Sequence, residues 1–257
     1  MKTTVFDKSS RRLFFFSAPP LKGVRPSRRV LPNPPFKDAK PWQCSVFYYW
    51  WEYLRRHEGY RKCCENGGKG TYSKLYRDFG DIHTVEFWTW WKERGQYLFS
   101  EPVPLYVDRV SVEDAKNLSE HQILVSIPLT QSIAVTVRQM KRVVLPLLKK
   151  QRIEKKKSRA MYPVASKPIL SALHQHLRIY DLHKANPKLP YHKIADLAEI
   201  IVETGYAKNT DDDNNSDTKH LKTMAVGRHI NIAKSYIENV ALGKFPFRAK
   251  KSKSDPT

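Results

Sequence analysis

All six tryptophans of this 257-residue chain lie between residues 42 and 91, and eleven tyrosines and phenylalanines lie with them between residues 47 and 99. Rings of this size carry much of the apolar surface that a chain can bury, so the segment predicts a folded core. With 40% hydrophobic residues overall, the chain does not belong to the wholly disordered class. Because no uninterrupted apolar run approaches about 18 residues, we expect no membrane-spanning helix.

Apolar spacing in the aromatic segment predicts three helices. The first covers about residues 42–63 and has apolar residues at intervals of three and four: Phe47, Trp50, Trp51 and Leu54. The second covers Ser73–Phe79. The third covers about residues 84–94, with Thr84 as its N-cap and Gly95 after its last residue.

Two short strands and a long helix are expected next. Residues 103–110 and 123–129 indicate β segments, the first at a sheet edge because Pro104 has no N–H to donate. A helix then covers about residues 132–157, with a kink expected at Pro146. Its apolar residues form one stripe: Ile133, Val137, Met140, Val144, Leu147 and Leu148.

The C-terminal part predicts three further helices, at about 167–184, 191–203 and 218–242. The second helix is expected to turn inward Ile194, Leu197, Ala198 and Ile201. A short helix placed after a turn and before another helix is typical of helix-turn-helix units, in which one helix enters the major groove. A plain packing module explains the same spacing. The expected fold class is therefore mainly α with a small β element (α+β), with a C-terminal three-helix, helix-turn-helix-like unit.

Composition divides the chain into five segments. Residues 1–41 hold ten Lys and Arg and seven prolines, so a disordered basic arm is expected there. The other segments are an aromatic-rich helical domain with short β segments at 42–130, a long basic helix or connector at 131–160, a C-terminal helical domain expected to bind DNA at 161–246, and a basic tail at 247–257.

Charge indicates the class of partner. The 46 Lys and Arg exceed the 25 Asp and Glu by 21, and the sequence pI is about 9.9. Solubility requires a net charge of only about 2–8, and nucleic acid is the commonest intracellular polyanion. An anionic membrane surface is the alternative, but no lipidation motif accompanies the charge. Three cysteines, two of them adjacent, form no disulfide framework, so we expect a cytoplasmic location.

Two groups of residues are the candidate nucleic-acid contacts. The basic end of the long helix holds more cations than its dipole requires and is expected to contact phosphate. The last helix carries donors suited to phosphate and base edges. The predicted contacts are Lys149, Lys150, Arg152, Lys155, Lys156, Lys157 and Arg159 in the first group, and Lys219, Lys222, Arg228, Asn231 and Lys234 in the second.

Catalytic and metal-binding alternatives are weaker. Asp78, Asp81 and Glu86, or the run 211–213, offer carboxylates to Mg²⁺ for phosphoryl transfer. The set Cys44, His57, Cys63, Cys64 and His83 has no Cys-x-x-Cys pair for zinc. On a helix, His174 and His176 point in divergent directions, which disfavours a joint metal site. We expect no cofactor, and the aromatic residues are expected to form core rather than a base-stacking platform.

Four strings resemble uncharacterised proteins of bacterial prophages and mobile elements: VFYYWWEYL at 46–54, FGD at 79–81 with FWTWW at 87–91, SIPLT at 126–130 and VALGKFP at 240–246. The resemblance implies a role in a bacterial DNA transaction and carries no activity. The function expected is that of a nucleic-acid-binding regulatory or accessory protein of a mobile element, with DNA favoured over RNA. The alternatives are a Mg²⁺-dependent nucleic-acid-processing enzyme and an RNA-binding component of a ribonucleoprotein.

Overall fold

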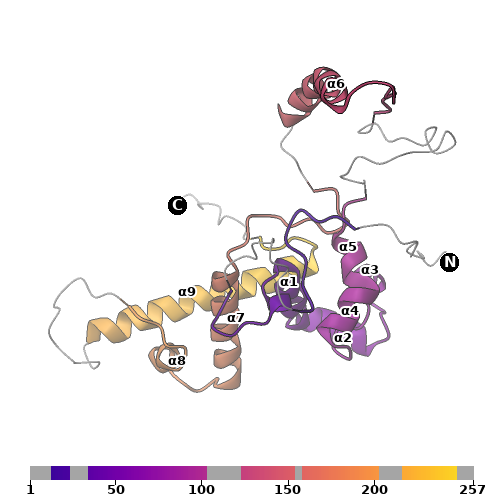
Figure 1. Ribbon diagram of the computed structural model, residues 1–257. Coiled ribbons are helices and arrows are strands. Elements are labelled where there is room, and N and C mark those ends of the chain that lie inside the picture. Colours follow the sequence, from indigo (N-terminus) through magenta and orange to yellow (C-terminus); the bar gives the residue numbers. More distant parts are fainter. Residues whose placement is uncertain (1–12, 24–33, 103–122, 154–157, 203–215, 248–257) are drawn as a thin grey trace, which may run out of the picture. The chain divides into compact units, whose positions relative to one another are not determined.

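The computed structural model describes residues 13–23, 34–102, 123–153, 158–202 and 216–247 (Figure 1). The chain forms two compact units. One unit combines residues 1–102 with residues 159–257, and the other covers residues 103–158. The predicted strand at 103–110 and most of the basic tail lie outside the described residues.

The aromatic segment begins with a short helix, η1 (Pro41–Gln43), and continues into α1 (Val46–Arg55). Ser45 caps α1, because its hydroxyl accepts a hydrogen bond from the Phe47 N–H. Most of the side chains of α1 are buried: Val46, Phe47, Tyr49, Trp50, Trp51, Tyr53 and Leu54. A helix that is apolar on nearly all sides occupies the centre of a core.

The single helix predicted at 42–63 is interrupted at His57. The chain becomes extended there, with φ −78° and ψ 108°, and α2 (Glu58–Glu65) begins after it. His57 Nδ1 accepts a hydrogen bond from the Tyr60 N–H at 2.9 Å, so the imidazole serves as the N-cap. A histidine that acts as an N-cap is not visible from helical spacing, which explains the wrong prediction.

α3 (Ser73–Phe79) confirms its prediction and ends at Gly80, where φ is 72°. The third predicted helix begins later than Thr84: α4 covers Phe87–Trp90, a π-helical turn labelled η2 covers Trp91–Gly95, and α5 covers Gln96–Phe99. Gly95 therefore lies inside the helix. A Cβ at Gly95 would come within 2.8 Å of the rings of Trp90 and Trp91, so glycine is required by packing.

The C-terminal helices are α7 (Leu170–Ala185), α8 (Tyr191–Leu197) and α9 (Ser216–Ala241). α8 is shorter than predicted, because Glu199 adopts a positive φ of 54° and the Ile200 N–H bonds back to the Ala195 carbonyl at 2.9 Å. Ile194 and Ala198 are buried as expected. Leu197 and Ile201 are exposed, since they lie at and beyond this helix end.

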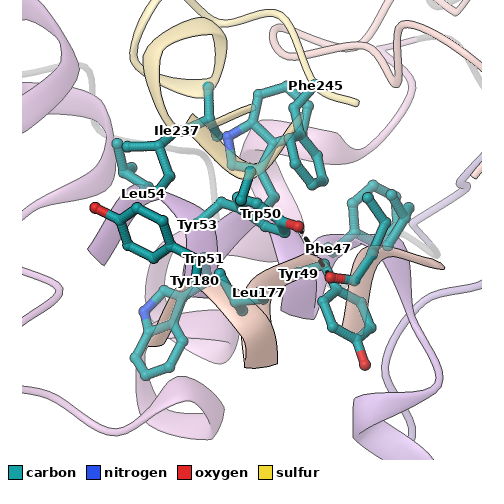
Figure 2. Close-up of a cluster of buried hydrophobic side chains, with 14 of the residues drawn as sticks. Phe47, Tyr49, Trp50, Trp51, Tyr53, Leu54, Leu177, Tyr180, Ile237 and Phe245 are labelled. Atoms are coloured by element: carbon teal, nitrogen blue, oxygen red, sulfur yellow. Dashed lines mark hydrogen bonds between the residues drawn. The ribbon is translucent and has the colours of Figure 1, made fainter. Parts of the chain in front are cut away.

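The aromatic segment and the C-terminal helices share one hydrophobic core. The Tyr53 hydroxyl donates to the Leu173 carbonyl at 2.9 Å, and the rings of Trp50 and Phe245 lie 5.6 Å apart (Figure 2). The structure thus divides the chain differently from the predicted boundaries at 42–130 and 161–246. These contacts join positions more than a hundred residues apart, which local composition does not reveal.

Part of the predicted disordered arm is packed against this core. The Phe15 ring lies 5.9 Å from the Phe47 ring and 5.7 Å from the Trp91 ring. The Ser45 hydroxyl donates to the Ala18 carbonyl at 2.8 Å. The Phe15 ring and the Ala18 carbonyl therefore anchor this part of the predicted arm. The rest of the predicted arm that lies in 1–12 and 24–33 is outside the described residues.

The second unit contains α6 (Ile133–Ile153), which confirms the long helix and contains Pro146. Residues 123–128 form no strand, because nothing in the described chain pairs with their backbone groups. Much of the apolar stripe of α6, including Ile133 and Val137, is exposed. The fold is mostly helical, as predicted, and the described residues contain only an isolated β-bridge between Val164 and Phe245.

Candidate functional site

The predicted contact residues of α9 lie on different parts of its surface. Arg228, Asn231 and Lys234 are exposed, whereas the opposite face of the helix is buried. Lys222 is only partly exposed and its ammonium lies 2.9 Å from the Asp196 carboxylate. The hydrogen bond from Lys222 lowers the pKa of Asp196. Lys222 therefore has a structural role in joining α8 to α9, while the first three residues are accessible to a ligand.

The relation between α8 and α9 differs from a short helix-turn-helix. α8 ends at Leu197 and α9 begins at Ser216, whereas helix-turn-helix units use a turn of 3–4 residues. Residues 203–215 of this connection, with the acidic run 211–213, lie outside the described residues. α9 packs against α1, α7 and α8, so it is a central helix of the core as well as a surface helix. The helix-turn-helix-like unit stays a prediction.

The basic group at 149–159 is divided between the two units. Lys149, Lys150 and Arg152 belong to α6, although their side chains lie outside the described part. Lys155, Lys156 and Lys157 also lie outside it. Arg159 belongs to the other unit, is exposed, and donates its backbone N–H to the Glu101 carboxylate at 2.9 Å.

Three basic residues of α6 were not among the predicted nucleic-acid contacts. Arg138, Lys141 and Arg142 are all exposed, and they project to one side of the apolar stripe at helical spacing. No acidic residue occurs anywhere between Ile123 and Ile153. The signal was available in the sequence, because the same helical spacing that defines the stripe places these residues beside it.

The carboxylates proposed to bind Mg²⁺ do not form a shared site. The Asp78 carboxylate accepts a hydrogen bond from the Tyr162 hydroxyl at 2.6 Å, and the Asp81 carboxylate accepts one from the His83 N–H at 2.9 Å. Glu86 is exposed. In the described chain, no group of three or more His, Cys, Asp or Glu residues is placed to hold a metal ion. Asp78 and Asp81 thus each have a separate local hydrogen bond.

The histidines and cysteines considered as zinc ligands lie in separate surroundings. His57 caps α2, and its Nε2 lies 3.4 Å from the Glu238 carboxylate. Cys63 and Cys64 are buried, and burial raises the pKa of the Cys64 thiol to about 11. His174 stacks on Phe36 with ring centroids 4.3 Å apart. His57 and His174 thus each have a separate local partner.

The aromatic segment is core, as predicted. Trp50 is fully inaccessible and Trp51, Trp90 and Trp91 are buried beside it. Trp88 is partly exposed and packs at the edge of the core. Buried rings cannot offer their faces to nucleic-acid bases, so a stacking platform built on these tryptophans is not supported.

A pocket that the sequence analysis did not identify lies between α1 and α7. Its volume is about 410 Å³, and it is lined by rings from both helices and from the segment before η1. The Arg56 guanidinium forms a two-point ion pair with Asp181 at 2.6 and 2.8 Å and also bonds to Glu52. Glu52 and Arg56 are an i,i+4 pair visible in the sequence, but Asp181 is 125 residues away from Arg56. This distance explains why the pocket was missed.

Comparisons with known proteins assign neither a family nor a function to this chain. No protein-family model, curated protein or solved structure matches the chain. Among the helices that the structure describes, none has the length and apolar character needed to cross a membrane.

Proposed function

We propose that the protein binds nucleic acid, DNA in preference to RNA, as a regulatory or accessory protein in the bacterial cytoplasm. The observation that carries this proposal is the charge of α6. Every ionisable side chain from Ile123 to Ile153 is a cation, and Arg138, Lys141 and Arg142 are exposed. A helix of this kind attracts phosphates along its length, because no carboxylate competes for its cations.

The exposed face of α9 supplies a second set of contacts. Arg228 and Asn231 are three residues apart on this helix and both are exposed, so they share one face. Arginine pairs bidentately with guanine and asparagine with adenine in the major groove. We assign them to base recognition and assign Lys234 to phosphate contact. The resemblance to prophage and mobile-element proteins supports DNA as the partner.

Catalysis on nucleic acid is not favoured by the described residues. The carboxylates near residue 80 are occupied singly by Tyr162 and His83, and no metal-binding group is present in the described part. Divalent-dependent cleavage of labelled DNA is the measurement that distinguishes an enzyme from a binding protein. We expect no cleavage when Mg²⁺ is added.

The binding proposal is tested by a matched pair of triple variants. In the first, Arg138, Lys141 and Arg142 are replaced by Ala; in the second, the exposed Lys62, Lys69 and Lys74 are replaced by Ala. Both remove three positive charges. We expect the first variant to lower affinity for a duplex at low salt and to reduce the salt slope by up to about 3, because each lost phosphate contact reduces the slope by about 1. Equal losses in both variants would mean that only net charge matters and that α6 is not the contact surface.

A further inference from the structure

The apolar stripe of α6 is not used by the proposed phosphate contacts. Ile133, Val137 and Leu147 are 83%, 44% and 45% exposed, and Met140 and Val144 are partly exposed. α6 is the only helix that the structure describes within its unit, residues 103–158, so no second described helix of that unit covers the stripe. Aliphatic side chains exposed in a row along a helix indicate an interaction surface.

The stripe has the spacing of a coiled-coil seam. Intervals of four, three, four and three residues separate its members, which we call the α6 seam: Ile133, Val137, Met140, Val144 and Leu147. This alternation is that of the heptad repeat abcdefg, in which positions a and d face a partner helix. Val137 and Val144 take position a, and Met140 and Leu147 take position d. Valine at a, with residues not branched at Cβ at d, favours two parallel helices.

The positive charges of α6 lie away from this seam. Arg138 takes position b and Arg142 takes position f, which point away from a partner, and both are exposed. Lys141 takes position e, beside the seam. In a parallel pair, a residue at e faces the residue at g five positions earlier on the other helix, so Lys141 would face Thr136. No two cations therefore oppose each other between Ile133 and Leu148.

Three further features favour a helix as the partner over a lipid surface. Val143 at g and Leu148 at e are 53% and 49% exposed, and the parallel register places each opposite the other, which extends the apolar contact. α6 contains no Trp, Tyr or Phe, whereas helices that lie in a membrane interface commonly place Trp or Phe on the apolar face. Pro146 takes position c, so its ring lies outside the seam.

We propose that the α6 seam pairs in parallel with the α6 seam of a second copy of this chain. The pair is a two-stranded coiled coil that buries the seam and keeps Arg138 and Arg142 of both copies on its outer surface. This inference goes beyond the proposed function, because self-association is measured without nucleic acid. In the presence of a duplex, the pair would offer phosphates two sets of α6 cations in place of one.

Sedimentation equilibrium of the full-length protein without nucleic acid tests the pairing. We expect a reversible monomer–dimer equilibrium between about 1 and 100 µM. Val137→Glu places a carboxylate in the seam of each copy, so it should weaken dimerisation by at least about tenfold. Val135→Glu is the matched control, because Val135 is 39% exposed, like Val137, but takes position f. It introduces the same charge and should change the dimer constant by less than about twofold.

Disulfide cross-linking tests the orientation of the two helices. The three native cysteines are buried, so an added surface cysteine is the reactive one. In a parallel pair the two copies of Ile133 oppose each other at position d, and Ile133→Cys should give a disulfide-linked dimer on a non-reducing gel after mild oxidation. Val135→Cys is the control at position f and should remain largely monomeric on the same gel.

Four results would overturn the proposal. The first is a protein that stays monomeric up to about 100 µM. The second is a dimer that Val137→Glu and Val135→Glu weaken equally, because another surface would then form it. The third is failure of Ile133→Cys to cross-link a dimer that depends on the seam, which would exclude the parallel orientation. The fourth is a monomer that binds phosphatidylglycerol vesicles and loses this binding in Val137→Glu, which would identify the partner as an anionic bilayer.

Salt and nucleic acid distinguish this inference from the proposed function. Salt screens repulsion between the two sets of outer cations, so dimerisation should not weaken as salt rises, whereas nucleic-acid binding should. If the protein dimerises through the seam and binds no duplex, the inference stands and the proposed function is wrong. If a duplex binds with strong salt dependence to a protein that stays monomeric, the proposed function stands and the inference is wrong.

Discussion

The Nδ1 atoms of His176 on α7 and His229 on α9 lie 2.7 Å apart. At this distance one imidazole must donate and the other accept, so only one of the two Nδ1 atoms can carry a proton. The rings lie 4.7 Å apart by their centroids, and Tyr236 stands 6.1 Å from His176. The pair joins two helices of the shared core and requires at least one neutral histidine.

The histidine pair predicts a loss of stability in mild acid. Burial, followed by the charge of Arg228, lowers the pKa of His229. As pH falls through the ordinary histidine pKa of about 6.5, the unfolded chain therefore binds protons that the folded protein does not bind. Burial lowers the pKa of His174 and of His83 in the same direction. We expect the free energy of unfolding to be highest above about pH 6.5 and to fall below it.

His229→Gln tests the contribution of the pair, because an amide can bond to the His176 nitrogen without titrating. We expect a smaller difference in melting temperature between pH 7.5 and pH 5.5 than in the unmodified protein. Thermal melts at a series of pH values measure this difference. An unchanged pH dependence would show that the pair does not contribute to acid sensitivity.

Trp50 is expected to contribute much more to stability than Trp88. Trp50 is completely buried and contacts Phe99 and Phe245, whereas Trp88 is partly exposed. Trp50→Ala should lower the free energy of unfolding by about 3–5 kcal/mol, and Trp88→Ala by about 1–2 kcal/mol. Chemical denaturation of the two variants measures both values. Equal effects would contradict the placement of Trp50 at the core centre.

Ser45 is expected to matter because it joins two segments. Its hydroxyl accepts from the Phe47 N–H at 3.3 Å and donates to the Ala18 carbonyl at 2.8 Å. Ser45→Ala should cost about 1–2 kcal/mol and should make residues 13–23 more sensitive to protease. Ser73→Ala is the control, since Ser73 is exposed and begins α3 without capping it, and it should change stability by less than about 0.5 kcal/mol.

Local patterns predicted most helices and failed where a single side chain changed the backbone path. Helical spacing of Ile169, Leu170, Leu173, Leu177 and Tyr180 predicted α7. The last four are buried, whereas Ile169 lies at the N-cap and is exposed. The break at His57 depends on a side-chain nitrogen acting as a cap, which spacing does not express. Glycine at position 95 was interpreted as a helix end, whereas it allows close approach of two tryptophan rings.

Long-range contacts were beyond sequence reasoning. The pocket needs Asp181 and His174 beside α1, and the core needs Phe245 beside Trp50. Nothing in the local spacing of any of these residues identifies its partner. The exposed cations of α6 could have been predicted, because the sequence itself shows that residues 123–153 contain no carboxylate.

Phosphate contact and base recognition are expected to be lost in different variants. Replacing Lys155, Lys156 and Lys157 by Ala should weaken all DNA sequences alike, because lysine is a flexible point charge. Arg228→Ala or Asn231→Ala should cost about 1–3 kcal/mol on a preferred site and little on random DNA. Selection from random duplexes, followed by binding of these variants, makes the comparison. If no preferred site emerges, or if Arg228→Ala weakens every sequence equally, α9 does not read bases.

The central claim is that this protein neutralises nucleic-acid phosphates, and a salt titration of binding tests it most directly. Affinity of the full-length protein for a labelled duplex is measured between 50 and 200 mM monovalent salt. If about 6–10 phosphates are neutralised, affinity should fall by about 10³–10⁵ over this range. A flat response to salt, or no binding at 50 mM, would contradict the proposal that the net charge of +21 serves nucleic acid.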